Sequence, residues 1–182
     1  AMLRAQSFLE SSYMRERALR DLVENVAAYD GSRSMAELIS LQCRELGLTL
    51  SQCRCAVVAE LQRWENDSSE NAYRLMLSEI RSLFSHPRNI ICPQRNRLIT
   101  VLVTPERELP EEESADNIED TVRELVLNLS CKGVEADVAL GFPASDLNGL
   151  AISLRSARDS LRLAGRLKRS GVISSRSLAS EA

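Results

Sequence analysis

The first hydrophobic pattern in the chain has helical spacing. Residues 2–28 contain neither proline nor glycine, and their larger apolar side chains recur mostly at helical intervals: Phe8, Leu9, Leu19, Leu22, Val23 and Val26. This spacing predicts one long amphipathic helix whose apolar stripe is interrupted by polar residues in the middle. Two interpretations follow. The helix either only covers a core, or it is a connector or dimer helix in which Leu19, Leu22 and Val26 form the dimer and signalling surface.

The next segments alternate between helical and strand-like patterns. Residues 34–37 form a Ser-x-x-Glu capping box, which predicts the start of a short helix, and Gly47 is expected to end it. The nearly continuous apolar run at 55–61 predicts a buried strand. Apolar positions at helical intervals over 72–83 predict a further helix, which ends before Pro87.

The second half of the chain adds three strands and two helices. A strand at 89–92, a polar turn at 93–96 and a strand at 98–103 form a predicted hairpin, and a solvated loop follows at 104–116. The next helix is capped by Asp116 or Asn117 and ends at Lys132-Gly133. A strand at 134–140 and a helix at 147–168 complete the pattern. The loop is predicted from its two prolines and six acidic residues.

The order of these elements predicts the fold class. From residue 55 onward it is β-α-β-β-α-β followed by a helix, which is the connectivity of a ferredoxin-like split unit. We therefore predict an α/β (α+β) fold in which both middle helices cover one face of an antiparallel sheet. The expected organisation is a connector helix and a short helix in residues 1–50, an α+β domain in 51–175, and a flexible tail in 176–182.

Charge and composition exclude several classes of protein. The 26 acidic and 23 basic residues give a net charge of −3, which argues against a strongly basic nucleic-acid binder. No apolar run approaches the roughly 18 residues of a membrane span, and no export signal is recognisable. We therefore expect no membrane partner and a cytoplasmic location. The five cysteines are odd in number and scattered, which argues against a disulfide framework.

The residues do not predict a catalytic centre. The seven glycines are dispersed, so no phosphate-binding loop is expected. The single histidine, His86, precedes a proline and has no nucleophile beside it in the sequence, and the acidic run at 111–113 is predicted to be solvated. Arginines along the last helix are most simply a solvated face. We expect no enzyme activity, no metal and no cofactor.

Several segments nevertheless resemble a known family. Residues 17–22 (RALRDL), 44–50 (RELGLTL) and 54–58 (RCAVV) resemble the central region of carbohydrate diacid regulators and of their purine-catabolism relatives. Residues 149–157 (GLAISLRSA), which follow a strand ending in 138–141 (VALG), resemble the signature helix of that family. The similarity spans about residues 14 to 173.

This resemblance implies a degenerate GGDEF-like domain, similar in fold to diguanylate cyclases. In active cyclases the hairpin between the second and third strands carries Gly-Gly-Asp/Glu-Glu-Phe, whose glycines admit the nucleotide and whose acid binds the metal. The corresponding turn here has neither glycine nor carboxylate, and consists of Cys92, Pro93, Gln94, Arg95 and Asn96. The resemblance thus implies an inactive domain.

The family also implies a function and partners. Its regulators place a sugar-diacid sensing domain before this module and a DNA-binding helix-turn-helix after it, and we find neither in these residues. We expect the catalytically inactive, central signalling and dimerisation module of a bacterial transcriptional regulator that responds to sugar diacids and works as a homodimer. Two alternatives stay open: a nucleotide-binding or cyclase-like enzyme with the same fold, and direct binding of an effector by this domain.

Overall fold

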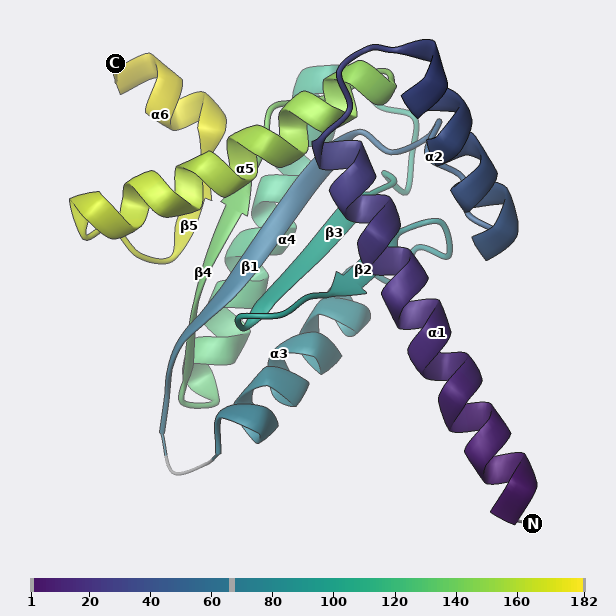
Figure 1. Ribbon diagram of the computed structural model, residues 1–182. Helices are drawn as coiled ribbons and strands as arrows, with labels where there is room; N and C mark the ends of the chain where they lie inside the picture. The colour runs from purple at the N-terminus through teal and green to yellow at the C-terminus, as the bar shows by residue number, and fades with distance from the viewer. Residues whose placement is uncertain (1, 66–67, 182) are drawn as a thin grey trace.

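The computed structural model describes residues 2–65 and 68–181, which form a sheet covered by helices on both faces (Figure 1). The elements are α1 (Met2–Ala27), α2 (Arg33–Leu46), β1 (Cys55–Trp64), α3 (Ser69–Leu83), β2 (Ile90–Pro93), β3 (Leu98–Val103), α4 (Glu111–Cys131), β4 (Val134–Leu140), α5 (Leu147–Leu167), β5 (Val172–Ser174) and α6 (Ser175–Glu181). The predicted mixed α/β class is confirmed.

The sheet has the strand order β2-β3-β1-β4-β5. The central strand β1 pairs antiparallel with β3 and β4, as the split β-α-β-β-α-β prediction requires. The four predicted strands pair antiparallel, as expected, and the structure adds a fifth strand that was not predicted, β5, which pairs in parallel with residues 138–140 of β4. With three residues, β5 is too short to show an alternating pattern in the sequence, and only its partner strand defines it.

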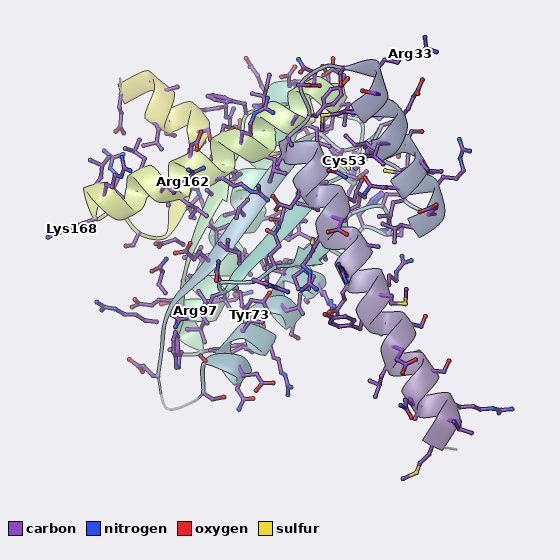
Figure 2. All side chains as sticks on the ribbon, viewed as in Figure 1. Arg33, Cys53, Tyr73, Arg97, Arg162 and Lys168 are labelled. Carbon is purple, nitrogen blue, oxygen red and sulfur yellow. The ribbon has the colours of Figure 1, made fainter. Side chains whose placement is uncertain are left out.

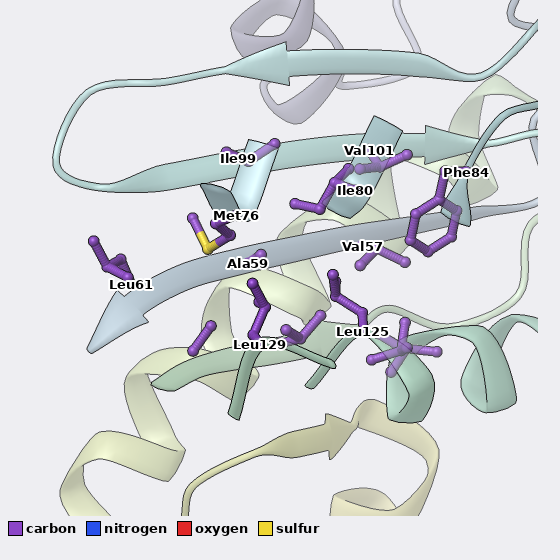
Figure 3. Packing of buried hydrophobic residues seen from close by; sticks show 14 of the residues in the cluster. Val57, Ala59, Leu61, Met76, Ile80, Phe84, Ile99, Val101, Leu125 and Leu129 are labelled. Carbon is purple, nitrogen blue, oxygen red and sulfur yellow. The ribbon is translucent and has the colours of Figure 1, made fainter. Parts of the chain in front are cut away.

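Each face of β1 contributes to a separate core. Successive side chains of a strand point to opposite faces, so Val57 and Ala59 pack under α3 and α4 (Figure 3), whereas Ala56 and Val58 pack under α1, α2 and α5. This explains why the run at 55–61 is apolar at nearly every position. The expectation that both middle helices lie on one face is confirmed.

The N-terminal helices share the second core. The second half of α1 contributes Leu22 and Val26, and α2 contributes Ile39, to the same cluster as Val58 and Leu154. We predicted residues 1–50 as a connector preceding the domain. In the structure the second half of α1 packs against β2 and α5, and α2 packs on α1, so that both helices add to the apolar layer that α5 begins on this face of the sheet.

Only the second half of α1 has this support. The first half projects away from the sheet (Figures 1 and 2), and residues 2–14 are all exposed. Phe8 is 74% exposed, whereas Leu22 is fully buried. Among the described residues, no helix combines the length and apolar content that crossing a bilayer requires.

Two helix starts differ from prediction. The cap of α2 is Ser32, whose hydroxyl accepts from Met35 N–H at 3.4 Å, and not the predicted box at 34–37. Helix α4 begins at Glu111, inside the predicted loop, so that the acidic run 111–113 forms its first turn. Carboxylates are favourable there because the helix dipole places partial positive charge at the N-terminus. Both helix ends at glycine, Gly47 and Gly133, have positive φ and confirm prediction.

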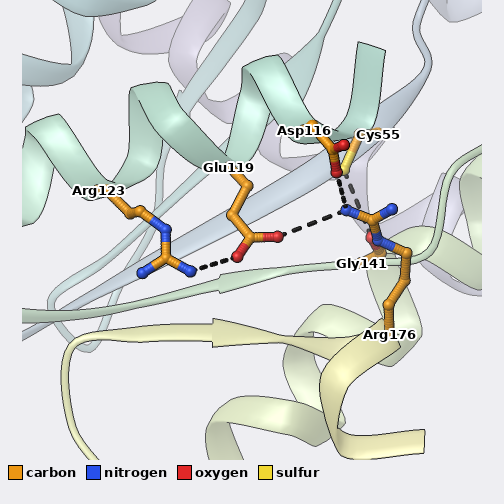
Figure 4. A network of polar contacts seen from close by, with 6 residues as sticks. All are labelled: Cys55, Asp116, Glu119, Arg123, Gly141 and Arg176. Carbon is orange, nitrogen blue, oxygen red and sulfur yellow. Dashed lines mark hydrogen bonds and ion pairs between the residues drawn. The ribbon is translucent and has the colours of Figure 1, made fainter. Parts of the chain in front are cut away.

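The predicted flexible tail is a helix. Residues 175–181 form α6, and Ala182 lies outside the described residues. Arg176 at its start donates to Asp116 at 2.9 Å and to Glu119 at 3.4 Å, which ties α6 to α4 (Figure 4). Leu178 packs at the edge of the second core. These tertiary contacts order a segment whose short polar sequence gives no helical pattern.

Candidate functional site

The turn between β2 and β3 is the segment that, by the resemblance, corresponds to the nucleotide-contacting hairpin of active cyclases. Its backbone passes through Asn96 and Arg97, both in the left-handed region with φ of 61° and 63°. Asn tolerates this conformation because its short amide bonds locally, whereas Arg has no such advantage. Gln94 N–H donates to Leu98 O at 2.9 Å and closes the turn, and Leu61 N–H of β1 donates to Arg97 O at 3.1 Å.

The predicted turn at Cys92–Asn96 is shifted in the structure. Cys92 and Pro93 belong to β2, and the turn proper comprises residues 94–97. Pro93 is allowed in a strand because β2 is at the edge of the sheet, where one missing N–H costs no ladder bond. Within 94–97 there is neither a glycine nor a carboxylate, as expected.

An aromatic residue from α3 supports the turn. The hydroxyl of Tyr73 lies 2.8 Å from Leu98 O and 3.2 Å from Gln94 O, so one O–H serves both carbonyls. Burial raises the pKa of Tyr73 to about 12. On the other side, the guanidinium of Arg97 stacks 4.9 Å from the ring centroid of Trp64. Figure 2 labels both Tyr73 and Arg97 beside the hairpin.

The side chain of Gln94 connects the turn to two helices. Its amide donates to Glu24 Oε1 of α1 at 3.1 Å, and its carbonyl accepts from the hydroxyl of Thr100. Glu24 in turn accepts from both terminal nitrogens of Arg158 on α5, at 2.6 and 3.2 Å. The hydrogen bonds from Gln94 to Glu24 and from Arg158 to Glu24 thus connect the hairpin, α1 and α5.

These three residues, Gln94, Glu24 and Arg158, lie far apart in the sequence. Glu24 and Arg158 are separated by 134 residues. The sequence placed Gln94 in the turn and Arg158 in a solvated basic stripe, and it singled out nothing at Glu24. No local signal could have paired them, because ion pairing across such a separation depends on how α1 and α5 pack.

The three signalling residues predicted on α1 are not an outward seam. Leu22 and Val26 are both fully buried in the chain's own core, and Leu19 packs at the edge of that core. They cannot pair with a second copy while α1 is docked. The exposed large apolar side chains of α1 lie in its first half: Met2, Leu3, Phe8, Leu9, Tyr13 and Met14.

The described residues contain no group of three or more His, Cys, Asp or Glu side chains arranged to hold a metal ion. His86 Nδ1 accepts from Arg88 N–H at 3.1 Å, which is a local turn contact. Cys53 and Cys55 are two residues apart in the sequence but are buried separately: Cys55 belongs to one core and Cys53 to the other. Burial raises the pKa of each thiol to about 11.

Comparisons with known proteins agree with this geometry. The sequence pattern of the GGDEF-like domain family matches residues 30–163. Among solved structures, the GGDEF domain of DgcB from Caulobacter crescentus, in complex with c-di-GMP, superposes with a TM-score of 0.50 at 14% sequence identity. That similarity covers 75% of this chain and 84% of the other, and it establishes the fold alone. The comparison with curated proteins found no match.

Proposed function

Because the chain belongs to the GGDEF-like domain family, we propose that it is a non-catalytic signalling and dimerisation module of a bacterial transcriptional regulator that responds to sugar diacids. Under this proposal, diacid binding and DNA binding belong to a sensor domain and a helix-turn-helix elsewhere in the regulator. The module would act in the cytoplasm, where the regulator meets DNA.

The structure of α1 is the observation that carries this proposal. One half of the helix is part of the core, and the other half extends outward with large apolar side chains exposed. In the outer half, Met2, Leu9 and Tyr13 are seven and four residues apart and therefore share one face. A helix built in this way suits a connector that associates with a second copy at one end and reports to the domain at the other.

The proposed mechanism is a shift between two packings of α1. Leu19, Leu22 and Val26 pack on the sheet in the present structure, and the sensor would favour a second arrangement of the same residues. The two arrangements of α1 must pack differently, because the sensor can shift the equilibrium between them only if it interacts more strongly with one than with the other. The dimer contact is thus assigned to the outer half, and the signalling contact to the inner half.

The non-catalytic assignment rests on the turn. Gln94, Arg95, Asn96 and Arg97 offer amide and guanidinium groups, so a metal-bound triphosphate would find no carboxylate ligand there and no bare backbone to approach. Tyr73 and the neighbouring strand β1 hold this turn closed. The alternative, a cyclase-like enzyme, would need a different arrangement of this hairpin.

A dilution series tests dimerisation. Light scattering should show concentration-dependent association of the full chain, and Leu9→Ser with Tyr13→Ser should raise its dissociation constant by about tenfold or more. The matched control is Leu127→Ser on α4, an equally exposed leucine outside α1. A chain that stays monomeric at all concentrations contradicts the proposal, as does an equal effect of the control. Incubation with GTP and Mg²⁺ tests the alternative, since turnover would establish an enzyme.

A further inference from the structure

A cleft of about 470 Å³ lies beside the hairpin turn, between α1 and α5. Cavities of this size accept small-molecule ligands. Its lining carries four guanidinium groups from three elements, namely Arg20 of α1, Arg95 of the turn, and Arg158 and Arg162 of α5. Only two carboxylates face them in the lining, Glu24 and Glu60. The cleft therefore has an excess of positive charge.

Two of the four arginines have no hydrogen-bond or ion-pair partner among the described residues. Arg158 binds Glu24, and Arg162 on the surface of α5 (Figure 2) binds Asp159 at 2.8 Å. Arg20 and Arg95 make no hydrogen bond or ion pair with the residues that the structure describes, although Arg20 is half-buried. A guanidinium presents five N–H donors, and partial burial limits the water that can satisfy them. An anionic ligand would supply the missing acceptors.

The charges of α1 and α5 converge on one point of the sheet. Burial raises the pKa of the Cys92 thiol on β2 to about 12, and the positive charges of Arg20 and Arg158 act on it in the opposite direction. Glu24 acts on the same thiol and raises its pKa. Arg20, Glu24 and Arg158 all line the cleft, and α1 packs against both β2 and α5.

The remaining walls of the cleft are apolar. Val58 of β1, Leu98 of β3 and Leu161 of α5 contribute side chains to the lining. A ligand that fits all parts of this surface has charged ends for the arginines and a short carbon frame for the apolar wall. The described residues offer no cluster of metal-ligating side chains here, so neutralisation of the ligand would fall to the guanidinium groups.

We propose that this cleft binds a small organic dianion, a dicarboxylate or a phosphate monoester, through Arg20, Arg95 and Arg158. Arg20 and Arg158 bind one anionic group from the two helices, and Arg95 binds the other from the turn. Planar guanidinium groups suit both ligand types, because they donate two parallel N–H bonds to carboxylate or phosphate oxygens. The site is thus distinct from a metal-dependent nucleotide site.

Glu24 acts as an internal competitor for this site. Its carboxylate already occupies Arg158 with two hydrogen bonds, in the manner expected of a ligand carboxylate. A bound dianion would take over Arg158 and release Glu24, and with it one of the polar contacts between α1 and α5. Only this last consequence rests on the proposed function of α1. Binding itself does not depend on dimerisation.

The test is calorimetry of the full chain in a buffer with EDTA. The probes are succinate for the dicarboxylates, glycerol 3-phosphate for the phosphate esters, and D-glucose as the uncharged control. We expect one of the dianions to bind at millimolar concentration or below and glucose not to bind. Preference for a dicarboxylate or for the phosphate ester identifies the ligand class, and either result supports the site.

Variants separate the site from general electrostatic attraction. Arg158→Gln and Arg95→Gln should each weaken binding by about tenfold, which is the loss expected for a charge-assisted hydrogen bond. Arg95 is exposed and makes no hydrogen bond or ion pair with a described residue, so its replacement should leave the fold intact even if Arg158→Gln does not. Arg166→Gln, an exposed arginine on α5 outside the cleft, is the matched control and should bind as the parent chain does. Glu24→Gln should bind more tightly, because the competing charge is gone.

Three results would overturn the proposal. The first is no binding of any dianion at millimolar concentration. The second is an equal loss in Arg166→Gln and Arg95→Gln, which would indicate nonspecific attraction. The third is binding that appears only with GTP and Mg²⁺. Association measured by light scattering without ligand tests the proposed function of α1 separately, so the two can fail independently.

Discussion

The hydroxyl oxygen of Ser153 on α5 accepts the backbone N–H of Ala56 on β1 at 2.9 Å, across 97 residues of sequence. Both residues are fully buried. The bond forms at the start of β1, where Ala56 also accepts from Gly141 N–H at the end of β4. A helix side chain thereby satisfies a strand group that the sheet leaves unpaired. Ser153 belongs to the segment that resembles a family signature, and this bond is its physical role.

Replacing Ser153 by Ala should lower the free energy of unfolding by about 1–3 kcal/mol, because it leaves a buried backbone N–H without an acceptor. Urea unfolding followed by circular dichroism measures this loss. The matched control is Ser78→Ala on α3, an exposed serine in a helix, which should change stability by less than about 0.5 kcal/mol. Equal effects of the two variants would contradict the role assigned to Ser153.

Gly141 packs closely against α5 beside Ser153, so Gly141→Ala should lower the free energy of unfolding more than Ser153→Ala does. A Cβ atom at residue 141 would lie 1.9 Å from Ser153 O, a backbone atom of α5 that cannot move independently. We expect a loss of about 3 kcal/mol or more, as for overpacked cores. Gly165→Ala, on the same helix with no atom within 4 Å of the added Cβ, is the control and should be neutral or slightly stabilising.

The hydroxyl of Tyr73 should stabilise the hairpin turn between β2 and β3. In Tyr73→Phe the carbonyls of Gln94 and Leu98 lose the phenolic donor, and we expect a loss of about 1 kcal/mol in the free energy of unfolding. Amide hydrogen exchange in residues 94–98 should become faster, while the exchange of β1 stays the same. Unchanged protection of the turn would show that Arg97 and Trp64 suffice to fix it.

The raised pKa of Asp137 should make the stability of the folded chain depend on pH. Its carboxylate accepts from Gly171 N–H at 2.8 Å, but burial outweighs this bond and raises its pKa above the usual 3.8. The folded chain therefore holds this proton more tightly than the unfolded chain does. The resulting stability is present below pH 3.8 and is lost as the pH rises through the folded pKa.

In Asp137→Asn this contribution should disappear, because the amide keeps an acceptor for Gly171 and carries no proton that titrates. Unfolding titrations between acidic and neutral pH measure the difference in slope between the variant and the parent chain. Relative to the parent, the variant should gain stability as the pH rises. A parallel pair of curves would show that Asp137 titrates at its usual pKa.

The cysteines predict a labelling pattern. Cys131 is exposed, whereas Cys43, Cys53, Cys55 and Cys92 are buried, and burial raises the pKa of each of these four thiols. A thiol reagent such as iodoacetamide reacts with the thiolate, so at neutral pH it should modify Cys131 alone. Mass spectrometry should show one label in the folded chain and five after denaturation. Cys131→Ser should remove the label of the folded chain.

Much of the fold could be predicted from the sequence, because hydrophobic periodicity is a local property. Alternation and helical spacing located β1, α3, β3, β4 and α5, since each of these elements must bury one face whatever its partner is. The order of the elements then fixed the split β-α-β-β-α-β connectivity. The family resemblance correctly indicated a GGDEF-like domain, and it left the sugar-diacid branch as a proposal.

The tertiary structure alone decided where each element finds its partners. The sequence identified Leu22 and Val26 as apolar residues of a helix, but only the packing of α1 on β2, α2 and α5 shows that they are buried within one chain. It likewise brings Glu24, Gln94 and Arg158 together, and pairs β5 with β4. A local hydrophobic pattern indicates that the apolar face of a helix or strand must be buried. Which of several distant surfaces covers it depends on energies between residues that are neighbours only after folding.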